Sequence, residues 1–359
     1  KKTQGTIMKI KTSLFYSFAA ASLLGSVANA QDASSATDPV GFHTINVYGA
    51  DANGARFSLI SPGLVNPIEY ASGTVSITAT TITVEGTPFV DIDYGQVGGV
   101  NAYYVEVTTG DEAGAWGNIT ANDDSTLTVD RDLSAAGAES IAVRKHVTIA
   151  DLFGPNNEAG LDPGDQPALA DEISLFANGA ADVIFYDDTE GFEGYINAAF
   201  DVKDNTPIEP QQGVYVQRKV AGDLAFTRAG HVKVGPTKLQ INTGYNNVAV
   251  PRAVGTDDQD NPVFTLGTSN LYDPADPTNS VDPGDSPDVA DEVIVANPAG
   301  GFSVYFYDTT EGFEGWIDAA FAPRDDIVLN NGTAFLLNRK ANLTRTSFIW
   351  TVPAEEIAD

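Results

Sequence analysis

Two acid-rich stretches of this chain are each repeated, and their carboxylates have the type and spacing that could do chemistry. FYDDTEGFEGYINAAF at residues 185–200 returns as FYDTTEGFEGWIDAAF at 306–321, with thirteen of sixteen positions identical. DPGDQPALADE at 162–172 returns as DPGDSPDVADE at 282–292, with eight of eleven identical. Each pair could be a duplicated site, or only a turn that two copies of one fold both need.

The aspartate-rich repeat gathers carboxylates as calcium sites do. Calcium takes about six to eight oxygen ligands from carboxylates, carbonyl groups and water, and a Pro-Gly turn can bring several carboxylates together. The spacing is not that of an EF-hand loop, so a plain turn with solvated acids is the competing interpretation. The predicted metal ligands are Asp162, Asp165, Asp171, Glu172, Asp282, Asp285, Asp291 and Glu292. Calcium is the one cofactor that these residues suggest.

The second repeat offers paired carboxylates and aromatic rings. A glycosidase uses two carboxylates about 5–9 Å apart, and the acids available are Asp187, Glu190, Glu193, Asp308, Glu311 and Glu314. Phe and Trp alternating with Glu around glycines are equally typical of a hairpin whose rings pack inward. Since two full copies of a catalytic site in one chain are unusual, we predict no catalytic residue. The rings that could stack on a ligand are Trp116, Tyr195 and Trp316.

Composition excludes several classes of function. The formal net charge is −30, which disfavours binding to nucleic acid or to anionic membrane surfaces. The chain has no cysteine, so disulfides and thiolate chemistry are absent. His43, His146 and His231 stand alone, without a second ligand at a spacing typical of zinc sites. No nucleophile elbow, phosphate-binding loop or dinucleotide motif occurs.

The start of the chain has the plan of a secretory leader. Met8 is the only methionine, two lysines follow it, and an apolar run covers 14–27 before Ala28-Asn29-Ala30. This order is typical of a signal peptide cut after small residues, and the run is too short for a membrane-spanning helix. We expect residues 1–7 to be upstream translation and 8–30 to be removed. The mature protein would then be exported to the periplasm, the cell surface or the medium, without membrane insertion.

The elements that must position these residues are strands. TVSITATTITVEG (74–86), AYYVEVTTG (102–110) and STLTVDRDL (125–133) are short alternating runs rich in Val, Ile, Thr and Tyr. Gly, Asn and Asp punctuate them. Segments with a helical period are scarce, and TIADLFG (148–154) allows only a turn or two. The sequence therefore predicts an all-β protein.

The repeats predict how the strands are grouped. Arg218-Lys219 recurs as Arg339-Lys340, whereas upstream only GFHTINVYG (41–49) and GYNNVAVPR (244–252) offer a weak match at a much larger offset. The difference in offset is about the length of the strand-rich segment 68–146. We therefore predict two tandem copies of a β-sandwich or barrel-like module, the first interrupted by a small inserted β domain. The predicted ranges are 38–67 plus 147–236 for module 1, 68–146 for the inserted domain and 237–353 for module 2.

Several stretches, in their order along the chain, resemble a paralogous family of exported, functionally unassigned proteins found in Verrucomicrobia. They are TDPVGF (37–42), YYVEVTTGDEAGAWGNI (103–119), STLTVD (125–130), RKHVTIADLFG (144–154) and ADEISLF (170–176). A looser likeness is to β modules of secreted bacterial proteins, carried here by Gly244-Tyr245-Asn246, Asp291-Glu292, Gly315-Trp316 and Pro210–Gly213. The resemblance implies export and a β fold, and it brings no site residues with it.

These observations favour an exported, non-enzymatic β-repeat protein with a structural or interaction role at the cell surface or outside the cell. A surface polysaccharide or a second copy of the chain would be its partner. Two alternatives stay open: a glycan- or calcium-dependent binding module, and a secreted glycoside hydrolase that uses the repeated carboxylates.

Overall fold

The computed structural model describes residues 39–354, and all of them belong to one compact unit, 36–359. The gaps in this range are 178–179, 192, 251–263, 298, 330–331 and 342–344. The predicted upstream segment and signal peptide, residues 1–30, lie outside the described residues. No helix within the described part of the chain is long and apolar enough to cross a membrane.

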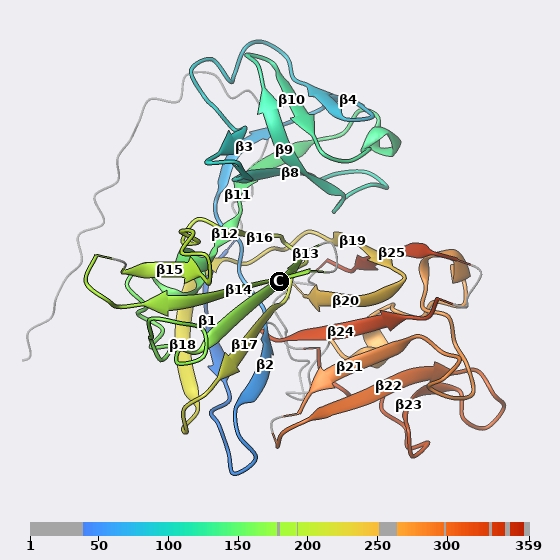
Figure 1. Ribbon diagram of the computed structural model, residues 1–359. Helices are drawn as coiled ribbons and strands as arrows, with labels where there is room; N and C mark the ends of the chain where they lie inside the picture. Colours follow the sequence, from blue (N-terminus) through green and yellow to red (C-terminus); the bar gives the residue numbers. More distant parts are fainter. Residues whose placement is uncertain are drawn as a thin grey trace, which may run out of the picture. The chain divides into compact units, whose positions relative to one another are not determined.

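The prediction of an all-β protein is confirmed, since antiparallel sheets make up nearly the whole fold (Figure 1). Module 1 contains a five-stranded sheet in the order β15-β14-β13-β17-β2 and a separate ribbon of β1 and β18. The bounds are β1 Val40–Val47, β2 Arg56–Ile60, β13 Glu172–Ala177, β14 Ala180–Asp187, β15 Gly194–Asn197, β17 Val214–Arg218 and β18 Leu224–His231. A short ribbon joins β12 (Val147–Thr148) to β16 (Pro207–Ile208).

Module 2 also contains a five-stranded sheet, in the order β20-β24-β21-β22-β23, and a ribbon of β19 and β25. The bounds are β19 Thr237–Asn242, β20 Gly244–Ala249, β21 Glu292–Ala296, β22 Phe302–Asp308, β23 Gly315–Asp318, β24 Ala334–Arg339 and β25 Ser347–Val352. Two 3₁₀ turns, Leu266–Thr268 and Pro277–Asn279, lie in the loop before β21. The repeated stretch 185–200 runs through β14 and β15, and 306–321 runs through β22 and β23 (Figure 1). The two stretches therefore occupy corresponding places in the two sheets.

The weak match between 41–49 and 244–252 is wrong. Strand β1 belongs to the two-stranded ribbon with β18, whereas β20 is the edge strand of a five-stranded sheet beside β24. The place of β20 is taken in module 1 by β2, which pairs with β17. Short alternating strands resemble one another whatever sheet they join, because alternation reports a half-buried face and not a partner.

The inserted domain has a seven-stranded sheet in the order β3-β11-β8-β9-β10-β5-β4 and a small hairpin of β6 and β7. The bounds are β3 Ile68–Ser72, β4 Ser76–Thr78, β5 Thr81–Thr83, β6 Gln96–Val97, β7 Val100–Asn101, β8 Tyr103–Val107, β9 Trp116–Asn122, β10 Thr126–Val129 and β11 Ile141–Lys145. A 3₁₀ turn covers Ser134–Ala136. Its buried apolar residues form a core of their own, drawn from Val75 to Val143.

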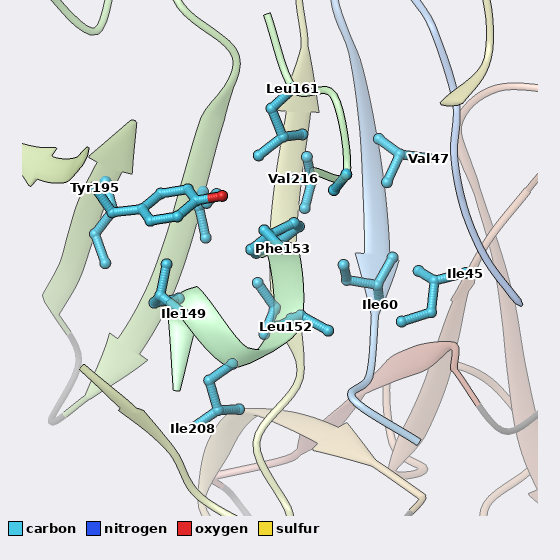
Figure 2. Packing of buried hydrophobic residues seen from close by; sticks show 14 of the residues in the cluster. Ile45, Val47, Ile60, Ile149, Leu152, Phe153, Leu161, Tyr195, Ile208 and Val216 are labelled. Atoms are coloured by element: carbon cyan, nitrogen blue, oxygen red, sulfur yellow. The ribbon is translucent and has the colours of Figure 1, made fainter. Parts of the chain in front are cut away.

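The core of module 1 combines residues from both sides of the insertion. Ile45 and Ile60 precede the inserted domain, whereas Phe153 and Val216 follow it, and all four belong to one buried cluster. Helix α1 (Ile149–Phe153) turns its apolar side chains toward the strands that carry Ile60 and Val216, as Figure 2 shows. The helix begins at Thr148 with a capping box that satisfies two orphan backbone donors. A separate cluster fills module 2, where side chains of the ribbon and the sheet meet.

Candidate functional site

The aspartate-rich repeat of module 1 is built around a buried carboxylate that accepts hydrogen bonds. The side chain of Asp171 is fully buried, and it accepts from the backbone N–H groups of Asp162 and Lys219, both at 2.8 Å. Arg218 Nη1 donates to the same carboxylate at 2.8 Å. The neighbouring Glu172 forms an ion pair with Lys219 Nζ at 2.6 Å. Two of the four predicted calcium ligands in this loop are therefore paired with the Arg-Lys dipeptide at the end of β17.

Module 2 repeats this arrangement and adds one arginine. Asp291 accepts hydrogen bonds from the backbone N–H groups of Asp282 and Lys340, both at 2.9 Å. Arg339 donates to Asp291 at 2.9 Å and to Asp282 at 3.0 Å. Arg345 donates to the second oxygen of Asp282. Burial raises the pKa of Asp291, against the opposing effect of these donors, so the cost of desolvating this carboxylate is not fully offset.

The two loops are thus braced internally by cations of the chain. Glu292 pairs with Lys340 Nζ at 2.7 Å, whereas Asp165 and Asp285 are exposed. Within the described residues no group of three or more His, Asp or Glu side chains is arranged to hold a metal ion. A buried carboxylate that accepts from two main-chain amides and an arginine satisfies donors that would otherwise be costly to bury. The calcium site stays a prediction, and the observed contacts give these acids a role in holding the loop.

The acids of the second repeat serve its turns. Asp187 and Asp308 are buried, and each accepts a hydrogen bond from the N–H two residues further along, at 2.8 and 2.6 Å. Glu193 accepts from a main-chain N–H of the same turn at 3.0 Å. Glu190 and Glu311 are exposed and lie in different modules. The repeat therefore provides one equivalent turn in each module.

The three predicted ligand-binding rings are buried. Tyr195 is 0 % exposed, and its hydroxyl donates to the Gly154 carbonyl at 3.1 Å. Burial raises the pKa of Tyr195, so the hydroxyl stays protonated as a donor. Trp116 and Trp316 are each 2 % exposed, and the Arg131 guanidinium lies 3.8 Å from the centre of the Trp116 ring. None of these rings presents an open face on which a sugar could stack.

Each copy of the second repeat ends in a turn with a phenylalanine in the left-handed region. Phe200 has a φ of 63° and Phe321 a φ of 60°. The turns are closed alike, because the side chains of Asn197 and Asp318 accept hydrogen bonds from the N–H groups two and four residues further on. A bulky residue at positive φ is uncommon and strained. Both phenylalanine rings are about half exposed.

A buried polar network lies where the inserted domain joins module 1. The amide nitrogen of Asn118 donates to Asp130 at 2.8 Å and to Glu209 at 3.0 Å. Because carboxylates only accept, the amide oxygen must face His146 Nε2, which lies 2.8 Å away. The proton of the neutral imidazole is therefore on Nε2. Burial lowers the pKa of His146 from 6.5 to about 3, so the ring is neutral at physiological pH.

A groove of about 850 Å³ lies between segments of the two modules. One wall comes from β13, β17 and the segment before β17, and the other from β19, β20 and β24. Hydrogen bonds join the walls: the Ala249 N–H donates to the Gln211 carbonyl at 2.9 Å, and the side-chain amide of Asn247 donates to the Gly213 carbonyl at 2.7 Å. A Cβ atom on Gly213 would lie 2.2 Å from Asn247 Oδ1, so this close approach requires glycine.

Aromatic and amide side chains dominate this groove. Tyr245 is 70 % exposed, and Phe176, which is 45 % exposed, packs edge-on against Tyr215 with ring centres 4.7 Å apart. The side-chain oxygens of Gln211 and Asn247 are buried and have no hydrogen-bond partner among the described residues. Concave sites that combine aromatic surface with a few polar atoms are the usual form of a ligand site, and the volume is within the usual range of about 300–1,000 Å³.

Comparisons with family models, with curated proteins and with solved structures find no match for this chain. The groove was not among the predicted sites, because its residues come from separate strands without a repeated motif. Two signals for it were present in the sequence: the adjacent pairs Gln211-Gln212 and Asn246-Asn247. Asn is depleted in strands, so an asparagine pair on an alternating strand indicates a role other than packing.

Proposed function

We propose that this protein is an exported, non-enzymatic β-repeat protein with an interaction role at the cell surface or outside the cell, and that it holds its partner in the groove between the modules. The observation that carries the proposal is the exposed ring of Tyr245 in a groove that is also lined by the exposed amides of Gln240 and Asn242. Exposed aromatic surface is costly in water, and a bound partner that covers the ring offsets this cost.

The groove supports binding better than hydrolysis. Hydrolysis of a glycosidic bond needs two carboxylates on either side of the bond, whereas within the described part of the chain Glu209 is the one carboxylate that lines the groove. Its Oε1 already accepts a hydrogen bond from Asn118 at 3.0 Å. The repeated acids, Glu190 and Glu311 among them, are not part of the lining.

Site-specific photo-crosslinking in the producing cells tests the interaction role without assuming a ligand. A benzophenone amino acid replaces Tyr245 in one version of the full chain and Phe42, an aromatic residue of β1 that is 79 % exposed, in the other. We expect a discrete adduct at position 245 and none at position 42. An adduct of twice the chain mass would identify self-association. Equal labelling at the two positions, or no adduct at position 245, would refute the groove as an interaction site.

A separate assay tests the proposal that the protein is not an enzyme. The purified protein is incubated with soluble polysaccharides, and new reducing ends are counted. We expect none above background. Release of reducing ends that is abolished by Glu190→Gln or Glu311→Gln would replace the proposal with the hydrolase alternative.

A further inference from the structure

We infer that the groove binds an uncharged glycan chain, an inference that rests on the proposed interaction role and names its ligand class. The lining is unusual for the number of side-chain amides that it contains. They are Gln211, Gln212, Gln240, Asn242, Asn246 and Asn247. An amide carries both a donor and an acceptor, and so does a sugar hydroxyl, so this lining matches a polyhydroxylated chain better than an apolar one.

The amide side chains differ in how many of their donors and acceptors already form hydrogen bonds within the fold. Asn246 is committed to the fold, because its Oδ1 accepts from the Asn242 N–H at 2.9 Å and its Nδ2 donates to main-chain carbonyls. Gln240 donates to Asn242 Oδ1 at 3.2 Å, and both residues are exposed. Gln211 Oε1 and Asn247 Oδ1 have no donor among the described residues. These two oxygens are buried beneath the surface, so the amides that a ligand in the groove can reach are those of the exposed Gln240 and Asn242, which can donate to and accept from its hydroxyl groups.

Aromatic rings provide the apolar part of the match. A pyranose ring has C–H faces that pack on aromatic rings, and Tyr245, which is 70 % exposed, offers the largest free ring in the groove. Phe176 and Tyr215 form a second aromatic surface on the opposite wall, with ring centres 4.7 Å apart. Aromatic surfaces of this kind contribute most when a ligand covers them and water leaves.

Charge restricts the glycan to a neutral one. Among the residues that the structure describes, no Lys or Arg lines the groove and Glu209 is the one charged side chain there. The chain as a whole carries a net charge of −30. Uronate and sulfate groups would meet repulsion without a cation to pair with, so acidic polysaccharides are disfavoured.

Affinity electrophoresis of the full chain tests the inference. Native gels contain a neutral polysaccharide (laminarin, mannan or hydroxyethyl cellulose) or an acidic one (alginate or carrageenan). We expect at least one neutral polymer to retard the protein, equally at low and high NaCl because no ionic contact is involved. Alginate and carrageenan should not retard it.

Matched variants locate the binding. Tyr245→Ala should weaken retardation about tenfold, which corresponds to the loss of one covered aromatic ring. Gln240→Ala should weaken it several-fold, whereas Phe42→Ala, at a similarly exposed ring outside the groove, should behave as wild type. Unchanged melting temperatures show that the variants fold.

Three outcomes would overturn the neutral glycan: no retardation by any neutral polymer, retardation by the acidic polymers alone, or equal weakening in Tyr245→Ala and Phe42→Ala. The crosslinking test then separates this failure from that of the proposed function. A position-245 adduct that glycosidases leave intact and whose tryptic peptides include a second protein would keep the interaction role and assign it to a protein partner. The absence of both adduct and retardation would refute both.

Discussion

Acidification tests the buried network at His146. Because burial lowers the pKa of this imidazole from 6.5 to about 3, the unfolded chain binds a proton before the folded chain does. Stability that depends on the neutral ring is therefore complete above pH 6.5 and is lost as the pH falls toward 3. At about pH 5 the unfolded state gains about 2 kcal/mol from protonation of this one residue, since each pH unit below the unfolded pKa is worth about 1.4 kcal/mol.

The perturbation is His146→Gln, which keeps a donor for the oxygen of Asn118 and removes the titration. The free energy of unfolding is measured in urea near neutral pH and at about pH 5 for both proteins. Tryptophan fluorescence reports on this region, because the ring of Trp116 lies 6.4 Å from that of His146. Between the two pH values the wild type should lose about 2 kcal/mol more than the variant. His43, whose pKa is also lowered by burial, is present in both proteins and cancels in this difference.

The result that would refute the reasoning is a parallel loss of stability in the two proteins. The imidazole itself provides a second measurement. With histidine labelled for NMR, the signal that disappears in His146→Gln should keep the chemical shift of a neutral ring at about pH 5, with its proton on Nε2. A signal that titrates near its ordinary pKa would show that the ring reaches solvent.

Three further predictions follow from the repeated stretches. Arg339→Leu should lower the free energy of unfolding by about 3–5 kcal/mol, because the side chain is fully buried and pairs with two aspartates. Arg218→Leu should lower it less, because this side chain is 12 % exposed and pairs with one aspartate. Equal losses of stability in urea would contradict this prediction. Phe321→Asn should change the unfolding free energy by no more than about 1 kcal/mol, because relief of the positive φ offsets the loss of the edge-on contacts of the ring with Phe306 and Phe313; a larger loss in urea would show that these contacts outweigh the strain. If the predicted calcium site forms, millimolar CaCl₂ should raise the melting temperature more than NaCl of equal ionic strength, and Asp162→Asn/Asp165→Asn should remove the difference; equal melting temperatures would leave the acidic loops held only by the cations of the chain that pair with them.

Alternation and turn residues were sufficient to predict the fold class. The runs at 74–86, 102–110 and 125–133 contain strands of the inserted sheet, and TIADLFG contains the short helix α1. Which strands pair with one another could not be predicted from alternation, as the wrong match of β1 with β20 shows. Alternation records which face of a strand is buried, whereas partners depend on the path of the chain.

The candidate sites, like the fold, could be predicted from the sequence only in part. The sequence showed that acids repeat, and also that Arg218-Lys219 repeats, but not that the two repeats contact one another. In the structure Arg218 lies 2.8 Å from Asp171, a residue 47 positions away. The spacing of the acids along the chain suggested that they share one local metal site. In the structure, Asp171 and Glu172 are instead paired with Arg218 and Lys219 at the end of the distant strand β17. The groove depends on such distant contacts throughout, because its walls belong to separate sheets.

Because the inserted domain interrupts module 1, strands that pair within this module are synthesised at widely separated times. Strand β1 is made early, yet it pairs with β18, and Thr44 meets Thr227 across a separation of 183 residues. The inserted domain, whose core lies between Val75 and Val143, can complete itself while β1 and β2 still lack their partners. Long-range antiparallel pairing of this kind is slow and leaves strand edges open to misassociation. The order of synthesis therefore makes the core of the inserted domain available before β1 and β2 acquire their partners, and the edges of these two leading strands are open until then.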